Sequence, residues 1–439
     1  MIQDCIAVIQ AGGRGERMIP LTKDLIPKPM LLLNGKPMLE WQIAAIARYG
    51  IREFVIIVGY LGNKIKDYLG DGSKLGVYIQ YIEENEPLGS GGAFSYLGSV
   101  VRTRNFLLVY GDIMFDVNLE RMLAFHESHC GYATLLAHPN AHPYDSDLLV
   151  IGQRDCVKDI DSKHNCRDYW YENCVNAGIY IFSTNILDNV YKPGKKDLEQ
   201  DILRPLIKEG KVFAYRSPEY VKDAGTPERF CKVSREQQEG IWRKKNLENR
   251  QVCIFLDRDG TVNRYRGLLY MEEQFELEDG VAEAIRRLNE AGYLVILVTN
   301  QPVVARGLCG IEDVERIHRK MQVLLGEEGA YLDDIMFCPH HPDKGYPEEN
   351  IQYKIPCNCR KPATGMISEA AEKYNIDLTQ SYMIGDSTID MQTGKNAGLR
   401  TILLLTGQAG KDGKYDVTAD ISADNLMDAV MAILDDCAE

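Results

Sequence analysis

The chain has 439 residues, 45% of them hydrophobic, and a formal net charge of −14 at pH 7. This length predicts two or three packed domains, and the acidic charge excludes the extended basic surface that nucleic-acid binding needs. Since no apolar stretch approaches the ~20 residues of a membrane span and the first residues lack a signal-peptide layout, we expect a cytoplasmic protein with no nucleic-acid or membrane partner and with reduced cysteines.

Short apolar runs alternate with amphipathic stretches in both halves of the chain, which predicts an α/β fold with mostly parallel sheets. The expected strands are 5–9, 54–58, 106–110 and 133–137 in the first half, and 252–256, 293–298, 381–384 and 401–405 in the second. Between the halves, 226–249 carries many charges and no strand-like run. We therefore predict domains at 1–232 and 251–439, joined by a helical connector at 233–250.

A glycine-rich loop, Ala11-Gly-Gly-Arg-Gly-Glu-Arg17, follows the first predicted strand. Its backbone N–H groups are suited to cradling a triphosphate. It is a poor dinucleotide fingerprint, because Met18 stands where GxGxxG needs its last glycine. Four cations then fall within fifteen residues, interrupted by prolines that disfavour a simple surface helix: Arg14, Arg17, Lys23 and Lys28. We predict a phosphate-binding loop, with a solvated charge run as the alternative.

Two carboxylates of the first half, Asp112 at the end of a strand and Asp223 before a turn, could jointly hold Mg²⁺. With the glycine loop, Pro27-Lys-Pro29, Leu88-Gly-Ser-Gly-Gly92 and Asn176-Ala-Gly178, they make residues 1–232 resemble the sugar-1-phosphate nucleotidyltransferases. The resemblance implies a Rossmann-like domain with a mixed, mostly parallel sheet. It also implies in-line attack of a sugar 1-phosphate on the α-phosphorus of a nucleotide, which expels pyrophosphate.

The resemblance also implies roles for individual residues. Arg17 and Lys28 would be catalytic, and the nucleotide and sugar would contact the following residues: Gly12, Gly13 and Gly15 at the triphosphate, Gly89, Gly91 and Gly92 at the base, and Asn176 and Gly178 at the sugar. The chain departs from the family in three places. Gln10 and Glu16 replace the usual leucine and small hydroxyl residue, and no Glu-Lys-Pro precedes Asn176, which leaves Lys163 as the substitute sugar-phosphate lysine.

In the second half, an apolar run ends in Asp257-Arg-Asp-Gly-Thr261. This arrangement places two carboxylates at the carboxyl edge of a sheet, where open α/β folds bind ligands. Asp257 can attack phosphorus, and Asp259 can protonate the leaving oxygen and then activate water.

Attack on a phosphate dianion needs neutralising groups, and later segments supply them in order. Thr299 would hydrogen-bond the phosphoryl oxygens and Lys361 would pair with them. Mg²⁺ would be held by Asp257, Asp259 and Asp386, with Asp390 nearby.

Cys338-Pro-His340 and Cys357-Asn-Cys359 form a second cluster of metal-ligating residues. Three thiolates and one imidazole are the ligand set of a closed structural Zn²⁺ site, with His341 as the competing ligand. Because Arg360 and Lys361 follow the last cysteine directly, the metal would hold the loop that carries the phosphate-binding cation.

Residues 251–439 resemble the haloacid dehalogenase (HAD) superfamily, which implies a three-layer α/β/α domain, here with a zinc loop and no room for a large cap. Within it, they are similar to the D-glycero-D-manno-heptose 1,7-bisphosphate 7-phosphatases. That similarity implies that Asn300, Arg306 and Arg360 contact substrate, with Arg306 at the phosphate that is retained. Pro302-Val-Val304 departs from the Ser-Gly turn usual there, and histidinol-phosphate phosphatases carry a similar zinc loop.

The two activities connect, because a heptose 1-phosphate is the product of one and belongs to the substrate class of the other. We therefore predict a bifunctional enzyme that makes GDP-heptose, with GTP inferred from resemblance to D-glycero-α-D-manno-heptose 1-phosphate guanylyltransferases. Its partners would be small-molecule substrates, and a helical connector such as 233–250 can also serve dimerisation. The alternatives are a different nucleotidyltransferase fused to a histidinol-phosphate-type phosphatase, and a non-catalytic nucleotide-sensing first half that regulates the phosphatase.

Overall fold

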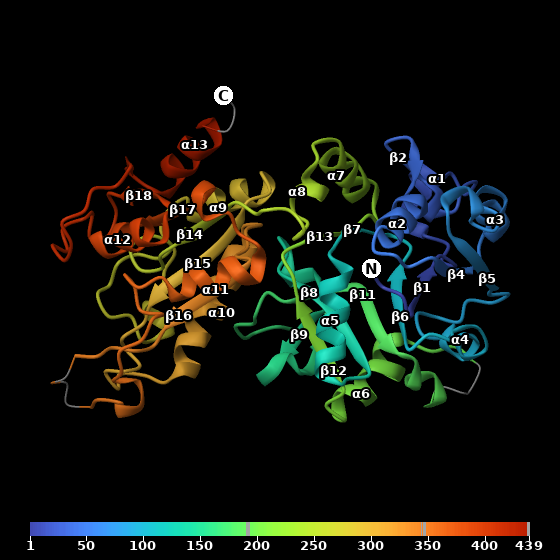
Figure 1. The fold of residues 1–439 in the computed structure, drawn as a ribbon, viewed down its shortest axis with the longest axis horizontal. Coiled ribbons are helices and arrows are strands. Elements are labelled where there is room, and N and C mark those ends of the chain that lie inside the picture. The colour runs from blue at the N-terminus through green and yellow to red at the C-terminus, as the bar shows by residue number, and fades with distance from the viewer. Residues whose placement is uncertain (190–193, 344, 346–347, 437–439) are drawn as a thin grey trace. The chain divides into compact units, whose positions relative to one another are not determined.

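The computed structural model describes residues 1–189, 194–343, 345 and 348–436, which form two compact units (Figure 1). The first unit contains residues 1–138, 147–162 and 175–246. The second contains residues 139–146, 163–174 and 247–439. Two short segments of the first half therefore pack with the second unit.

The first unit is built on a mixed nine-stranded sheet whose central path runs β10-β9-β11-β6-β1-β4-β5, with β8 pairing to β11 and β12 to β8. Its strands are β1 (Cys5–Gln10), β4 (Glu53–Val58), β5 (Tyr78–Glu83), β6 (Asn105–Tyr110), β8 (Ala133–His138), β9 (Leu148–Ile151), β10 (Val157–Asp161), β11 (Val175–Ser183) and β12 (Val212–Arg216). β6, β1, β4 and β5 are parallel, while β11 is antiparallel to β6, β8 and β9. The predicted parallel core is confirmed, and the antiparallel strands make the sheet mixed.

Helices and two small ladders complete the first unit. The helices are α1 (Ile19–Thr22), α2 (Met38–Ala47), α3 (Gly62–Leu69), α4 (Phe94–Val100), α5 (Leu119–His129), α6 (Arg204–Lys208), α7 (Pro227–Gln238) and α8 (Ile241–Lys244). The ladders pair β2 (Leu32–Leu33) with β3 (Lys36–Pro37) and β7 (Ile113–Asp116) with β13 (Tyr220–Asp223). α8 packs through Trp242 against Tyr220 of β13 at a ring distance of 5.2 Å. The helical connector is therefore part of a packed core.

The second unit has a six-stranded parallel sheet in the order β16-β15-β14-β17-β18-β19. Its elements are β14 (Cys253–Leu256), β15 (Leu294–Asn300), β16 (Asp334–Cys338), β17 (Tyr382–Gly385), β18 (Arg400–Leu404), β19 (Ile421–Ala423), α9 (Val281–Glu290), α10 (Ile311–Glu327), α11 (Gly365–Tyr374), α12 (Thr388–Ala397) and α13 (Leu426–Asp436). Ile254 and Leu256 share a core with α9, α10 and α13, whereas Cys253 and Phe255 share one with α11. Alternate residues of β14 thus face two helical layers, and the three-layer α/β/α prediction is confirmed.

The segments 139–146 and 163–174 are joined to each other and to α10. Arg167 donates from Nη1 to Pro143 O (2.9 Å) and from Nη2 to Ser146 O (2.8 Å), and Asn173 exchanges two hydrogen bonds with Asn140. The Asn173 N–H donates to Gln322 Oε1 of α10 at 2.6 Å. We call these two segments the clasp, which adds residues from the first half of the chain to the second unit.

Arg167→Ala is expected to lower the stability of the second unit by about 1–3 kcal/mol, because both carbonyls lose a charged donor. The measurement is thermal melting of the full-length protein, in which the variant is expected to unfold at a lower temperature. Arg154→Ala, an exposed arginine of the first unit, is the matched control. Equal melting temperatures for Arg167→Ala and the unsubstituted protein would contradict the role of the clasp.

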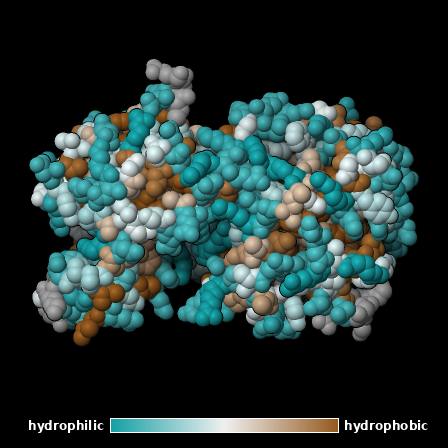
Figure 2. All heavy atoms as spheres, viewed as in Figure 1, coloured by the Kyte–Doolittle hydropathy of each residue, from teal (hydrophilic) through white to brown (hydrophobic). Residues whose placement is uncertain are grey.

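No helix among the described residues is long and apolar enough to cross a membrane. The face in Figure 2 is mostly hydrophilic, with brown side chains gathered in small, separate groups.

Candidate functional sites

The first candidate site lies at the carboxyl edge of the parallel sheet of the second unit. Asp257 directly follows β14, Thr299 and Asn300 end β15, and Asp386 directly follows β17. Lys361 Nζ lies 2.7 Å from Asp257 Oδ1 and 2.5 Å from Asp390 Oδ1, and its side chain is 2% exposed. These two carboxylates raise the pKa of Lys361 against the opposing effect of burial. The structure thus places a permanent cation against the predicted nucleophile.

The side chain of Asn300 forms two hydrogen bonds with the main chain of Lys361. Its Oδ1 accepts from Lys361 N at 2.9 Å, and its Nδ2 donates to Lys361 O at 3.0 Å. These contacts aim the lysine at Asp257, a positioning role that the sequence reasoning did not assign to Asn300.

Asp259, the predicted acid/base, is surrounded by three donors. Arg258 Nη2 lies 2.9 Å from both carboxylate oxygens, Gln301 Nε2 lies 2.9 Å from Oδ2, and Asn263 Nδ2 lies 3.2 Å from Oδ1. Gln301 Nε2 also donates to Thr299 Oγ1 at 2.9 Å, which links Thr299 to the acid/base. No role was assigned to Arg258 or Gln301 from the sequence. Their positions in the motifs that contain Asp257 and Thr299 could have indicated one.

Asp257, Asp386 and Asp390 bring carboxylate oxygens within 4.8 Å of one another. Burial, and then the charge of Asp257, raise the pKa of Asp386 to about 8, and burial raises that of Asp257 to about 6. Crowded, desolvated carboxylates of this kind fit a divalent cation. A Cβ at Gly260 would lie 2.2 Å from Asp386 Oδ2, which explains the glycine of the motif. The side chain of Asp259, a predicted magnesium ligand, is not part of this carboxylate group and instead accepts hydrogen bonds from Arg258, Gln301 and Asn263.

The raised pKa of Asp386 predicts that Mg²⁺ binding at these carboxylates would depend on pH. The folded protein holds this proton up to about pH 8, whereas the unfolded chain releases it near 4, so without Mg²⁺ the free energy of unfolding falls as pH rises through this window. Mg²⁺ must displace the proton, so the Mg²⁺-induced rise in melting temperature is expected to be larger at pH 8 than at pH 6. Thermal melting at both pH values, with Asp386→Asn as control, tests this. An equal rise at both would contradict it.

The four predicted zinc ligands lie together. Cys338 Sγ is 3.5 Å from Cys357 Sγ and 3.2 Å from Cys359 Sγ, and His340 Nδ1 is 3.7 and 3.4 Å from Cys338 and Cys359 Sγ. A tetrahedral site with Zn–S bonds of about 2.3 Å has edges of about 3.8 Å, so these separations fit a shared ion. His341 instead accepts through Nδ1 from Asp343 N at 3.2 Å. The donor set therefore fits Zn²⁺ with His340 as the fourth ligand.

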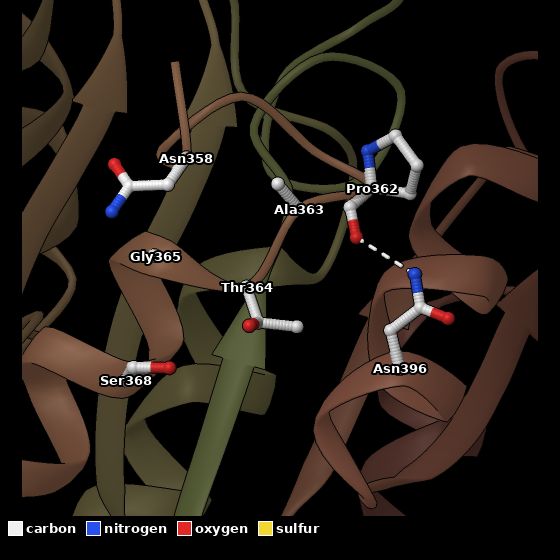
Figure 3. A pocket seen from close by; sticks show the side chains of 7 residues that line it. All are labelled: Asn358, Pro362, Ala363, Thr364, Gly365, Ser368 and Asn396. Atoms are coloured by element: carbon white, nitrogen blue, oxygen red, sulfur yellow. Dashed lines mark hydrogen bonds between the residues drawn. The ribbon is translucent and has the colours of Figure 1, made fainter.

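The predicted substrate arginines lie on loops near this cluster. Arg360 Nη1 donates to His340 O at 3.1 Å, which joins the metal loop to the segment that carries Lys361. Arg306 N donates to Pro302 O, and Val303 and Val304 are buried in a small core with Val314. The unusual Pro-Val-Val sequence is thus the apolar base of the Arg306 loop. A hollow of about 430 Å³ is lined by Asn358 and Pro362 of the segment that carries Lys361 and by Asn396 of α12 (Figure 3).

The second candidate site lies at the carboxyl ends of the parallel strands in the first unit, where Asp112 follows β6. Lys28 Nζ is 2.5 Å from Asp112 Oδ2, and a Cβ at Gly15 would lie 3.1 Å from Lys28 Cβ, so the glycine loop packs on this lysine. Asp223 pairs across the ladder with Ile113, next to Asp112, and its Oδ2 accepts from Arg229 Nη1 at 2.7 Å. The shielded Asp223 Oδ1 has no hydrogen-bond partner within the described parts of the chain. An oxygen of this kind fits a divalent cation.

Other predicted residues of the first unit surround this edge. Gly89 has φ +78°, and the backbone of Gly91 donates to Lys196 O at 2.9 Å. A Cβ at Gly92 would lie 2.3 Å from Leu88 O. Asn176 Oδ1 accepts from the N–H of Gly178, which has φ +74°. The glycines are therefore required by close backbone approaches.

The other predicted residues of the first half make fewer contacts with this site. Gly12 packs near Glu84, whereas a Cβ at Gly13 would meet no atom within 4 Å in the described structure. Arg17 is exposed in the turn Glu16–Met18 that follows the loop. Lys163 begins the second segment of the clasp, so the structure does not group it with the other predicted residues of the first unit.

Comparisons with known proteins give two sets of matches. Residues 6–240 match the Nucleotidyl transferase family and residues 358–429 match the HAD-hydrolase-like family. A D-glycero-beta-D-manno-heptose-1,7-bisphosphate 7-phosphatase from Haemophilus ducreyi is 38% identical over 40% of this chain and 96% of its own. A mannose-1-phosphate guanylyltransferase from Mycobacterium tuberculosis is 30% identical over 54% of this chain and 65% of its own.

Among solved structures, HddC from Yersinia pseudotuberculosis is 25% identical, covers 53% of this chain and 99% of its own, and has a TM-score of 0.47. The Nucleotidyl transferase match spans more than half of the chain, and the phosphatase match spans nearly the whole relative. The chain therefore belongs to the nucleotidyl transferase family and carries, in its C-terminal half, a HAD-like domain of the heptose bisphosphate phosphatase kind.

Proposed function

We propose that the chain is a bifunctional enzyme of nucleotide-activated heptose synthesis. The second unit would remove the 7-phosphate of D-glycero-D-manno-heptose 1,7-bisphosphate, and the first unit would transfer GMP from GTP to the heptose 1-phosphate. The observation that carries the proposal is the pairing of Lys361 with Asp257 in one unit and of Lys28 with Asp112 in the other. Each pair sets a cation beside a carboxylate where phosphoryl chemistry needs both.

In the phosphatase reaction, Asp257 attacks the 7-phosphorus, an O–P bond to the carboxylate forms, and the bond from phosphorus to the sugar oxygen breaks. Asp259 gives its proton to that oxygen. A water molecule then attacks the aspartyl-phosphate and gives a proton back to Asp259, which releases phosphate and restores Asp257. Lys361 offsets the charge of the phosphoryl group throughout, and a bound Mg²⁺ at Asp257, Asp386 and Asp390 would add electrostatic stabilisation.

In the transferase reaction, an oxygen of the sugar 1-phosphate attacks the α-phosphorus, and pyrophosphate leaves. Lys28 and Arg17 would offset the charge that develops on the phosphates, and the glycine loop would bind the triphosphate through backbone N–H groups. Asp112 and Asp223 would hold Mg²⁺, which lowers the charge of the triphosphate when bound. Asn176 and Gly178 would contact the sugar.

Zinc would have a structural role in this scheme. A Zn²⁺ ion at the Cys338, His340, Cys357 and Cys359 cluster would hold the loop from which Arg360 and Lys361 project. The relatives' names specify the β anomer of the bisphosphate, whereas the guanylyltransferase resemblance specifies α. Both anomers belong in the test.

The test measures pyrophosphate release from each of the four NTPs, with the α or the β heptose 1,7-bisphosphate as the only sugar and Mg²⁺ present. Release with GTP alone is expected, because it requires both reactions in sequence. Release of phosphate without pyrophosphate would support the phosphatase assignment. It would also indicate that the first unit acts on another sugar or senses nucleotides. Equal hydrolysis of histidinol phosphate would favour the alternative phosphatase.

A further inference from the structure

Gln10 occupies a place where the family resemblance predicts leucine. It is the last residue of β1, after the apolar run Cys5–Ile9, and pairs with Ile57 of β4 and Tyr110 of β6. Its side chain therefore leaves the central strand at the edge of the sheet where the glycine loop begins.

The amide of Gln10 is oriented by one contact. Nε2 donates to Gly89 O at 3.2 Å, in the loop Leu88–Gly92 that is predicted to lie at the base. Because a carbonyl only accepts hydrogen bonds, the amide must present its NH₂ group to Gly89 and its oxygen away from it. That oxygen is shielded from solvent and has no hydrogen-bond partner among residues 1–189, 194–343, 345 and 348–436. A shielded acceptor of this kind costs free energy unless a water molecule or a ligand supplies a donor.

Glu84 supplies a second acceptor at the same loop. It directly follows β5, and a Cβ at Gly12 would lie 3.1 Å from its Oε2. The Leu88 backbone hydrogen-bonds to its carboxylate, while its Oε1 is shielded and likewise lacks a partner in the described structure. Gln10 and Glu84 thus contact consecutive residues, Gly89 and Leu88, and each retains one acceptor oxygen.

We propose that Gln10, together with Glu84, reads the nucleobase and favours guanine. This inference rests on the proposed nucleotidyl transfer and extends it to base specificity. Guanine presents two adjacent N–H donors, N1–H and the 2-amino group, which match two acceptor oxygens. Adenine and cytosine present one amino donor beside a ring acceptor, and uracil presents one N–H between two carbonyls, so each would place an acceptor against an acceptor.

The substitution Gln10→Leu removes one of the two acceptors and restores the residue usual in the family. The full-length protein with Mg²⁺ is titrated with GTP, ITP and ATP by calorimetry, without a sugar. Inosine differs from guanosine only by the missing 2-amino group, so the unsubstituted protein is expected to bind GTP best, ITP next and ATP least, with at least about tenfold between GTP and ATP. In Gln10→Leu the GTP preference over ATP is expected to fall at least fivefold.

Gln3→Leu is the matched control, because Gln3 is exposed and precedes the same strand at its other end. If Gln10→Leu does not fold, as judged by thermal melting, Glu84→Gln replaces an acceptor with a donor at nearly constant size and is expected to reduce the preference as well. Ratios among the three nucleotides that stay within twofold of the original in the folded variant would overturn the inference. Absent binding of every nucleotide to the unsubstituted protein would instead overturn the proposed transferase function itself.

Discussion

Asp257→Asn is expected to abolish phosphate release from the heptose bisphosphate, by about 10³-fold or more, and to leave the transferase active on supplied heptose 1-phosphate. The amide cannot act as the nucleophile, and Lys361 loses one of its two carboxylate partners. Lys28 and Asp112 belong to a different compact unit and are not altered. The two assays are phosphate release from the bisphosphate and pyrophosphate release from GTP with the monophosphate.

Two substitutions serve as controls for this experiment. Asp279→Asn changes an aspartate of the same unit whose side chain is 94% exposed, and it should preserve both activities. Lys28→Met should give the converse result, with phosphate release retained and pyrophosphate release lost. Loss of both activities in Asp257→Asn, with melting unchanged, would refute independent sites.

We expect the unsubstituted protein to bind one zinc ion per chain, and we expect Cys359→Ser to retain only a small fraction of it and to lose phosphatase activity at least tenfold. One of four ligands is lost, and binding energy at such closed sites is also folding energy. Because Arg360 and Lys361 directly follow Cys359, the loop that carries the active-site lysine would lose its anchor. Metal content by mass spectrometry and phosphate release provide the measurements.

Cys309→Ser is the matched control, because Cys309 belongs to the same unit but lies outside the cluster. It should retain zinc and activity, and the transferase should work in both variants. A Cys359→Ser protein with full phosphatase activity and no zinc would show that the metal does not hold the lysine loop.

Local sequence determined much of the fold. The apolar runs at 5–9, 54–58 and 106–110 became β1, β4 and β6, and those at 252–256 and 293–298 became β14 and β15. Burial on both faces of a parallel sheet requires continuous apolar strands, and this pattern is visible in a single sequence. The family resemblance implied a mixed sheet, but the apolar pattern did not predict the positions of β9, β10 and β11, because the pairing of such strands depends on contacts with their neighbours in the sheet.

The sequence by itself also determined which residue types meet at the phosphatase site. Motifs such as Asp257-Arg-Asp-Gly and Gly385-Asp386 end parallel strands, so topology brings them to one edge. Only the tertiary structure showed that Arg258 and Gln301 donate hydrogen bonds to Asp259 and that Asn300 is hydrogen-bonded to the main chain of Lys361. It also showed that the clasp belongs to the second unit. These contacts depend on side-chain directions and long-range packing, and the spacing of residues along a chain carries neither.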